Sequence, residues 1–247
     1  MAAITLRFVG SGDAFGSGGR LQTCLHLSGA GEGSLLLDCG ASSLIGLKRA
    51  GLDPSEVGWV LLSHLHGDHF GGLPFLVLDG QFSRRARPLV VAGPPGVRAR
   101  VEAAMEVLFP GSTGVTRRFD VTYVELLDRV PAAIGPARVT PFLVEHASGA
   151  PPHALRVEYG GRTVTYSGDT QWTDALVDAA READLFICEA YTAERPLRFH
   201  LDLATLRAQA ARLTARRIVL THMGPDMLAR AGEGDWERAE DGLAITL

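Results

Sequence analysis

The chain has 247 residues, of which 46% are hydrophobic and 21% charged, a composition that excludes a disordered or low-complexity protein. No apolar run approaches the roughly 18 residues that a membrane-spanning helix needs, so the sequence predicts no membrane segment. The formal charge of −4 argues against broad, non-specific binding to nucleic acid, which depends on a basic surface.

The amino-terminus and the cysteines both favour a cytoplasmic location. Met1–Phe8 has no basic region followed by a long apolar core, so we expect no signal peptide. The cysteines, Cys24, Cys39 and Cys188, are sparse and odd in number, which predicts a reducing compartment without a disulfide framework. Cys39 and Cys188 end apolar runs, and we interpret them as small buried hydrophobic residues rather than catalytic ones.

The first quarter of the chain reads as short strands with one helix. The glycine-rich segment Gly10–Gly19 loosely resembles a dinucleotide-binding fingerprint, but no amphipathic helix follows it, as that fingerprint requires. We therefore interpret the segment as a long turn between antiparallel strands. The predicted elements are strands at Ile4–Val9, Thr23–Leu27, Ser34–Leu37 and Val57–Ser63, and a helix at Ser42–Ala50 that ends at Gly51.

The middle of the chain has fewer clear signals. Residues 70–78 form a glycine-containing turn that leads into an apolar segment. We interpret the arginines of Ser83–Arg87, and the pair Arg216-Arg217, as solvated side chains at loop and helix ends. The predicted elements are a short buried strand within Pro88–Gly96, a helix at Val97–Leu108, and strands at Val121–Leu126 and Ala137–Glu145.

The last third alternates strands with helices. Gly160-Gly161 lies between two strand-like runs, which predicts a tight hairpin. The predicted elements are strands at Ala154–Tyr159, Arg162–Tyr166, Leu185–Cys188, Arg217–Thr221 and Leu243–Leu247, and helices at Asp174–Glu182, Leu203–Leu213 and Asp226–Ala231. We find no repeat or linker, so we predict one α/β domain over residues 1–247, with two stacked sheets and helices outside.

Three histidines and an aspartate fall within six consecutive positions directly after the strand at Val57–Ser63. They are His64, His66, Asp68 and His69. On a continuing strand His64 and His66 would point to the same side, and His69 follows at the turn. Clustered imidazole and carboxylate groups suit zinc, and also iron or manganese. We predict a loop that presents ligands to two neighbouring metal ions.

Four more polar residues follow, or nearly follow, apolar strand runs: Asp38, His146, Asp169 and His222. Because strand ends meet at one rim of a sheet, we expect these side chains to converge on the cluster. Taken singly, Asp169 is also compatible with a turn aspartate and His222 with a strand-end histidine. The joint pattern favours a metal site.

With these residues in place, the sequence resembles the metallo-β-lactamase superfamily over nearly its whole length. Asp38 matches an aspartate that supports the metal loop, and His64-x-His66-x-Asp68-His69 matches the signature block. The resemblance implies an αββα four-layer sandwich of two mixed β-sheets flanked by helices, with two divalent ions, most often zinc, sharing a nucleophilic hydroxide. It also implies the ligands: His64, His66 and His146 for one ion, Asp68, His69 and His222 for the other, and Asp169 bridging both. Asp68 is in addition expected to orient or deprotonate the nucleophile.

His200 narrows the resemblance to one branch of the superfamily. It opens the run His200–Leu213, and this arrangement resembles ribonuclease Z and related phosphodiesterases, where a histidine acts on the phosphate or leaving group. A histidine can move protons near neutral pH, and Glu189 is a candidate to orient its ring. The alternative interpretation is a helix-capping or solvent-facing histidine.

One departure from ribonuclease Z bears on the substrate. That enzyme carries a tRNA-gripping arm between the positions that match His146 and Gly161, and residues 147–160 leave no room for it here. We therefore predict a hydrolase of a small-molecule or short nucleotide phosphodiester, not of structured tRNA, and we expect a homodimer. The open alternatives are hydrolysis of a lactone, thioester or sulfate ester on the same metals, and a non-enzymatic binding module.

Overall fold

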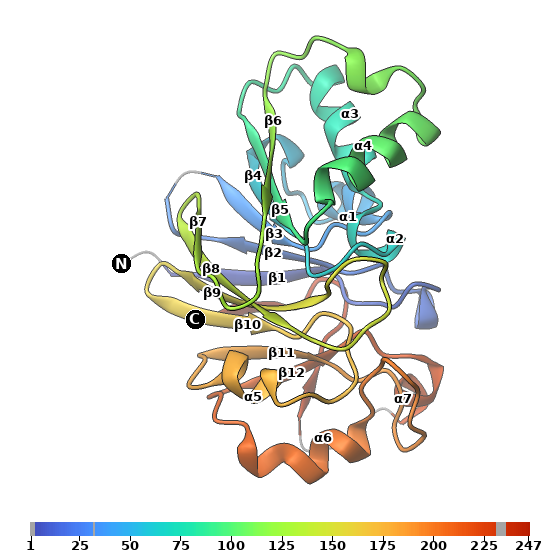
Figure 1. Cartoon of the computed structure of the whole chain (residues 1–247), viewed down its shortest axis with the longest axis vertical. Helices are drawn as coiled ribbons and strands as arrows, with labels where there is room; N and C mark the ends of the chain where they lie inside the picture. The colour runs from blue at the N-terminus through green and yellow to red at the C-terminus, as the bar shows by residue number, and fades with distance from the viewer. Residues whose placement is uncertain (1–2, 32, 231–235) are drawn as a thin grey trace.

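Two seven-stranded β-sheets pack face to face, and helices cover the outer face of each sheet (Figure 1). The computed structural model describes residues 3–31, 33–230 and 236–247. Met1, Ala2 and Ala231, which the predicted amino-terminal segment and a predicted helix include, lie outside the described residues. The arrangement confirms the predicted αββα sandwich of two mixed sheets. No helix among the described residues has the length and apolar character needed to cross a bilayer.

The first sheet has the strand order β14-β1-β2-β3-β4-β5-β6. Its strands are β1 (Thr5–Gly10), β2 (Cys24–Ser28), β3 (Ser34–Leu37), β4 (Val57–Leu61), β5 (Leu89–Gly93), β6 (Val121–Glu125) and β14 (Ala244–Thr246). Pairing is antiparallel from β14 to β3 and parallel from β3 to β6. The antiparallel pairing of β1 with β2 confirms that the glycine-rich segment is a turn.

The second sheet repeats this pattern, with the order β13-β12-β11-β10-β9-β8-β7. Its strands are β7 (Ala132–Ile134), β8 (Ala137–Leu143), β9 (His153–Tyr159), β10 (Arg162–Tyr166), β11 (Leu185–Glu189), β12 (Ile218–Thr221) and β13 (Glu237–Arg238). Pairing is antiparallel from β7 to β10 and parallel from β10 to β13. Gly160 and Gly161 both have positive φ, 56° and 78°, as the predicted hairpin requires.

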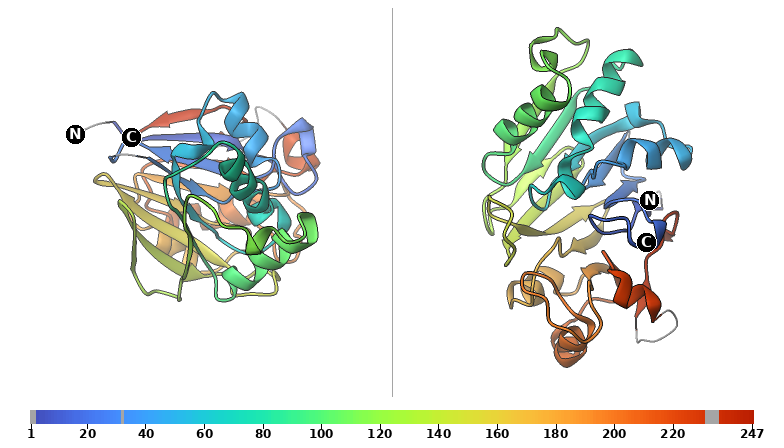
Figure 2. Two further views of the ribbon diagram at one scale, coloured as in Figure 1. Left: turned by 90° about the horizontal axis from the view of Figure 1, so that it is seen from above. Right: turned by 90° about the vertical axis from the view of Figure 1, so that its right-hand side faces the viewer.

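Three clusters of buried apolar residues hold the sandwich together. One lies between the sheets, and one lies under the helices on each outer face, whose arrangement Figure 2 shows. The cluster between the sheets joins residues such as Leu37 and Leu61 of the first sheet to Leu155 and Ile187 of the second. Outside the first sheet lie α1 (Ser43–Arg49), α2 (Gly67–Phe70), α3 (Leu73–Phe82) and α4 (Val97–Leu108). Outside the second lie α5 (Ala175–Ala180), α6 (Leu203–Gln209) and α7 (Pro225–Ala229).

The parallel strands of both sheets end at the same edge of the sandwich, which positions the candidate site. Asp38 follows β3, and the cluster from His64 follows β4. In the second sheet, Asp169 follows β10, Glu189 ends β11 and His222 follows β12. In open α/β sheets ligands bind outside the carboxyl ends of parallel strands, and here two such ends face each other.

Some local predictions differ from the structure. Strand β4 ends at Leu61, two residues before the predicted end at Ser63, and His64 and His66 lie on the loop that follows, as predicted. Residues 73–82 form α3, which is buried on several sides and therefore lacks the polar face that reveals a helix in a sequence. Strands β7 and β13 were not predicted, since two or three residues give no periodicity.

The arginine-rich segment 83–87 is the clearest error of interpretation, because Arg85 is buried and not solvated. Its guanidinium donates hydrogen bonds to the carbonyl oxygens of Pro54, Arg87 and Pro88, at 3.1, 2.7 and 3.0 Å, and to that of Val57. Arg85 thereby joins the segments that lead into β4 and β5. The pair Arg216-Arg217 is exposed, as predicted. All three cysteines are buried and free, which also agrees with the sequence.

Candidate metal centre

The loop after β4 carries the predicted cluster and is fixed against the turn that follows β3. The amide of Cys39 donates to the carbonyl of His69 at 2.6 Å, and the amide of Gly72 donates to the carbonyl of Cys39 at 2.8 Å. Asp68 and His69 lie on the short helix α2, and Oδ2 of Asp68 lies 3.1 Å from Nε2 of His69. His64 and His69 are completely buried, and His66 is partly exposed.

Asp38, in the turn after β3, holds this loop through hydrogen bonds to its residues Ser63 and His69. Its carboxylate accepts hydrogen bonds from the amide and hydroxyl of Ser63, at 2.8 and 2.7 Å, and from Nδ1 of His69, at 2.7 Å. Because Nδ1 of His69 is occupied, Nε2 is the atom that faces the interior. The backbone of Asp38 has a φ of 58°, a strained value for a residue other than glycine. Such strain concentrates at functional sites.

The second sheet contributes residues from separate strand ends. Asp169 is reached through Gly168, which has a φ of 60° and lies against Ser63 of the first sheet. His222 also has a positive φ, 54°, and its amide donates to the carbonyl of Ser11 at 3.1 Å. His146 lies in the loop between β8 and β9. These long-range contacts bring the two halves of the chain together at the site.

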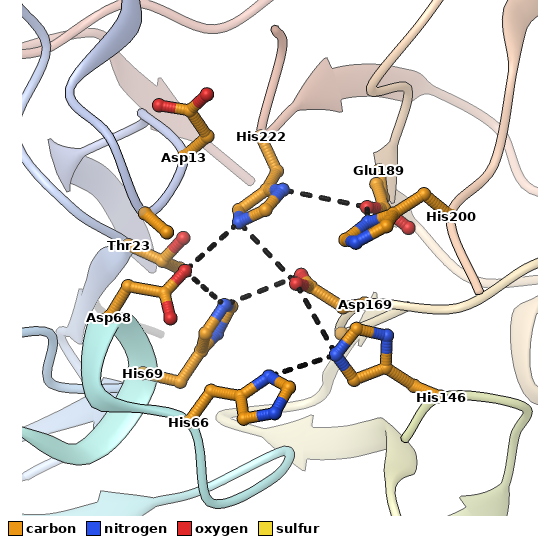
Figure 3. A network of polar contacts seen from close by, with 12 residues as sticks. Asp13, Thr23, His66, Asp68, His69, His146, Asp169, Glu189, His200 and His222 are labelled. Carbon is orange, nitrogen blue, oxygen red and sulfur yellow. Dashed lines mark hydrogen bonds and ion pairs between the residues drawn. The ribbon is translucent and has the colours of Figure 1, made fainter. Parts of the chain in front are cut away.

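The seven predicted ligands meet in two adjoining groups. Figure 3 labels all of them except His64. One group consists of His64, His66 and His146, and the other of Asp68, His69, Asp169 and His222; within each, one candidate ligand atom per residue lies within 4.8 Å of the others.

Asp169 lies between the two groups. Its Oδ2 is 4.0 Å from Nε2 of His64 and 3.9 Å from Nε2 of His146. The same oxygen is 3.5 Å from Nε2 of His222, while Oδ1 is 3.4 Å from Nε2 of His69. One carboxylate therefore reaches atoms of both groups, which is the position that a bridging ligand requires.

Outer hydrogen bonds orient most of these imidazoles. The hydroxyl of Ser63 donates to Asp38, so it can accept from Nδ1 of His64 at 3.0 Å. Nδ1 of His146 donates to the carbonyl of Phe199 at 2.9 Å. Each ring then turns its Nε2 inward. Metal-binding histidines characteristically use the second nitrogen in this way, because the outer acceptor fixes the tautomer and the ring orientation.

Several buried atoms of the site have no hydrogen-bond partner. Nε2 of His64, Nε2 of His69 and Oδ1 of Asp169 face the ligand groups, whereas Nδ1 of His222 faces Oε1 of Glu189 at 3.5 Å. Leaving a buried polar group unsatisfied destabilises a fold by about 1–3 kcal/mol, so three such atoms facing the ligand groups need an explanation. Imidazole nitrogens and carboxylate oxygens are ligands of zinc, iron and manganese. The residues present therefore fit divalent metal binding.

The electrostatics of the site also favour a cation. Burial alone would lower the pKa of His222, but the charge of Asp169 and the close carboxylates of Asp68 and Glu189 raise this pKa to about 10. His69 responds in the same way: the carboxylates of Asp169, Asp68 and Asp38 outweigh burial and raise its pKa well above the usual value. The field that stabilises an imidazolium here also stabilises a metal ion. By contrast, burial lowers the pKa of His64, which keeps that ring neutral and able to coordinate.

His200 lies beside the second group and not at a helix cap. The cap of α6 is Asp202, whose carboxylate accepts from the amide of Thr205 at 2.7 Å. Nδ1 of His200 contacts Oε1 of Glu189, a completely buried carboxylate that was only a candidate partner in the sequence. The His200 ring stacks parallel to that of His222, with centroids 6.0 Å apart and an interplanar angle of 6°.

A pocket of about 270 Å³ opens directly onto these residues. It is lined by the candidate residues His66, Asp68, His146, Asp169, His200 and His222, and by Ala14, Phe15, Tyr191 and Leu197. Sequence reasoning missed the last four. The one signal for Phe15 was an aromatic residue within a loop of small residues, and nothing in the sequence indicated Tyr191 or Leu197. The described loop between β8 and β9 spans only residues 144–152.

Comparisons with known proteins agree with this geometry. The β-lactamase superfamily domain matches residues 34–223. An uncharacterised protein of Mycobacterium leprae is 34% identical over 197 residues, covering 77% of this chain and 67% of that protein. Ribonuclease Z of Geobacillus kaustophilus is 28% identical over 255 residues, covering 82% of this chain and 81% of that enzyme. The crystal structure of YhfI from Bacillus subtilis, a metallo-β-lactamase fold protein, superposes with a TM-score of 0.81 at 20% identity and covers both chains completely.

Proposed function

The chain belongs to the β-lactamase superfamily and resembles its ribonuclease Z and phosphodiesterase branch, and from that premise we propose that it is a dinuclear metal-dependent phosphodiesterase. The observation that carries the proposal is the pairing of two ligand groups, joined by Asp169, with a separate Glu189–His200 pair in the same pocket. A metal centre alone would suit many hydrolases. The additional oriented histidine is what favours phosphodiester chemistry.

The two groups divide the proposed ligands. His64, His66 and His146 would hold one divalent ion, Asp68, His69 and His222 the other, and Asp169 both. The ions, which we propose to be zinc with manganese or iron as alternatives, would supply a water of lowered pKa and neutralise negative charge on a phosphodiester. The chain's own contribution is to hold the ligands through Ser63, Asp38 and the carbonyl of Phe199.

His200 is the proposed proton donor to the leaving oxygen. Glu189 occupies its Nδ1, so Nε2 is the nitrogen that can exchange a proton with a substrate. Glu189 is itself held in place, because its Oε2 accepts from the amides of Thr170 and Leu201 at 2.8 and 3.3 Å. A positioned general acid of this kind contributes about 10²–10⁴-fold to a rate.

Asp68 is the second proposed catalytic group. Its Oδ2 lies 3.1 Å from Nε2 of His69 and 3.3 Å from Nε2 of His222, at the wall of the pocket. These contacts lower the pKa of Asp68 despite its burial, so the group is an anion at neutral pH. From this position it can accept a hydrogen bond from an attacking water and orient it.

The proposed substrate is a small-molecule or short nucleotide phosphodiester. The nine residues 144–152 between β8 and β9 offer no arm to grip a folded tRNA. The alignment with ribonuclease Z points the same way. The alignment is 255 positions long but covers only 82% of this 247-residue chain. The remaining positions are gaps in this chain, so the relative contains residues that this chain lacks.

A substrate panel tests the proposal. The purified chain, loaded with zinc or manganese, is assayed with methyl p-nitrophenyl phosphate, a lactone, a thioester and an aryl sulfate. We expect metal-dependent phosphodiester turnover to exceed the other activities. Dominant lactone, thioester or sulfate turnover would replace the proposed reaction with another ester hydrolysis on the same site, and no turnover of any ester would favour a binding module.

A further inference from the structure

Phe15 has the highest fractional exposure of the large apolar side chains in the described part of the chain, 84%. It belongs to the β1–β2 turn and lines the mouth of the pocket that contains the candidate metal ligands. Other exposed apolar residues, such as Phe82 on α3 at 79%, lie outside this pocket. An aromatic ring exposed beside candidate catalytic groups points to contact with a ligand.

The turn that carries Phe15 is held by specific hydrogen bonds. The carboxylate of the buried Asp13 accepts from the amide of Phe15 at 3.2 Å, and from the amide and hydroxyl of Ser17 at 2.9 and 2.6 Å. The side-chain amide of Gln22 donates to the carbonyl of Ala14 at 3.1 Å and accepts from the amide of Ala41 at 2.8 Å. Phe15 is therefore presented to solvent by a fixed backbone.

Tyr191 provides a second aromatic surface in the pocket. Its ring lies 4.9 Å from that of His200, tilted by 33°. On another side it packs on Gly224, where an added Cβ would lie 3.2 Å from the Tyr191 ring and 2.9 Å from the Tyr191 carbonyl oxygen. Gly224 thus allows Tyr191 to sit beside His200. Leu197 completes the apolar part of the lining.

The charges of the pocket limit what else a substrate can carry. Its described lining contains histidines and the carboxylates of Asp68 and Asp169, but neither lysine nor arginine. A second phosphate would therefore meet no cationic side chain of the lining. The apolar surfaces instead suit an uncharged planar group attached to the single phosphate at the metal centre.

We propose that Phe15, with Tyr191 and Leu197, forms a subsite for a planar aromatic group carried by a phosphodiester of one negative charge. The group is a nucleobase or a simple aryl ring, both of which present a π-face to Phe15. This subsite rests on the proposed phosphodiesterase activity and adds to it the class of substrate. Stacking of a base on an exposed aromatic side chain is sequence-tolerant and strengthens binding several-fold to more than a hundredfold.

The test uses three substrates that share the p-nitrophenolate leaving group. They are the methyl, phenyl and thymidine-5′ esters of p-nitrophenyl phosphate, assayed with the metal-loaded full chain and with Phe15→Ala, Phe15→Leu and Phe15→Tyr. For the wild-type chain we expect kcat/KM for the phenyl or thymidine ester to exceed that for the methyl ester by about tenfold, mainly through KM. Phe15→Ala and Phe15→Leu should remove this preference, and Phe15→Tyr should retain it.

Controls separate this subsite from the rest of the machinery. Phe82→Ala removes a similarly exposed ring outside the pocket and should leave kcat/KM unchanged for all three substrates. A 3′-phosphate added to the thymidine ester should improve kcat/KM by no more than about twofold, because the lining supplies no cation for it. Preference for the phenyl ester alone identifies an aryl subsite, and preference for the thymidine ester alone identifies a nucleobase subsite.

The two proposals fail in different ways. If none of the three esters is hydrolysed while another ester class is, the phosphodiesterase assignment falls. If all three are hydrolysed with equal kcat/KM, and Phe15→Ala leaves every value unchanged, the activity stands and the aromatic subsite is wrong. A third outcome is that Phe15→Ala lowers kcat/KM equally for all three substrates, while Phe15→Tyr keeps the wild-type values. The p-nitrophenyl ring of the leaving group would then be the group that stacks on Phe15, which supports the subsite.

Discussion

The two sheets contribute to the candidate site in different ways. The first sheet presents His64, His66, Asp68 and His69 on one loop, fixed by backbone contacts to the neighbouring turn and by Asp38. The second sheet contributes one residue from each of several strand ends. The first half of the site is thus local in sequence, while the second exists only when the whole sheet has formed.

This difference suggests distinct roles for the two halves. Residues on one loop move together, so the loop can hold its ligand geometry against small shifts of the sheets. The second half, which includes Glu189 and His200, adjoins the pocket wall formed by Tyr191 and Leu197. We infer that both halves hold metal, and that the second half in addition carries the His200 that faces the substrate.

Asp169→Asn is the change with the largest expected effect, because Asp169 is the point where the halves meet. Removing its charge should abolish turnover and lower the metal content, measured by elemental analysis. Asp174→Asn, on an exposed aspartate of the same half, is the matched control and should retain both metal and activity. Two metals retained per chain in Asp169→Asn would contradict a bridging role.

The residues that lie close together in the sequence could be predicted as a site, whereas those that only the fold brings together were harder to predict or were missed. The cluster His64–His69 stood out because its residues are consecutive, while His146 and His222 gained weight only jointly with it. Phe15, Tyr191 and Leu197 could not be predicted as neighbours, since their proximity depends on packing between segments about 180 residues apart in a sheet-based fold. Helix α3 was missed for a related reason: burial on several faces leaves no polar stripe.

His200→Ala probes the half that faces the substrate. The variant should keep both metals, since His200 is not among their proposed ligands, yet cleave phosphodiesters about a hundredfold more slowly. The loss should be smaller for p-nitrophenyl esters than for alkyl esters, because p-nitrophenolate needs less protonation as it leaves. Equal rates for the variant and the wild-type chain across both ester types would remove His200 from the mechanism.

Asp38→Asn probes the support of the loop that carries the proposed ligands of the first half. The asparagine keeps the shape of Asp38 but weakens the acceptor for Nδ1 of His69 and for Ser63. Loss of such an outer partner lowers metal affinity about 10–100-fold. A chelator titration followed by activity should therefore reach half-loss at a correspondingly lower chelator concentration. Excess zinc should restore most of the rate; failure of excess zinc to do so would mean that Asp38 acts beyond metal binding.

The smallest effect on the site is expected for a change at Arg85, which is not part of the pocket lining and should affect stability but not activity. Arg85→Ala removes the guanidinium donor from the carbonyls of Pro54, Val57 and Pro88, of which the first two belong to buried residues. The expected loss is about 2–3 kcal/mol in the free energy of unfolding, measured by denaturant titration. Arg84→Ala changes an exposed neighbour and should cost less than about 0.5 kcal/mol.

The metal content and kcat/KM of folded Arg85→Ala should match the wild-type chain, because the loop after β4 is secured by Asp38 and the turn after β3 rather than by Arg85. This prediction sharpens the comparison between the two halves. If the variant unfolds more readily yet binds metal normally, the first half of the site is held locally, as proposed. If metal affinity falls together with stability, the loop depends on the whole first sheet, and the division into a local and a distributed half is wrong.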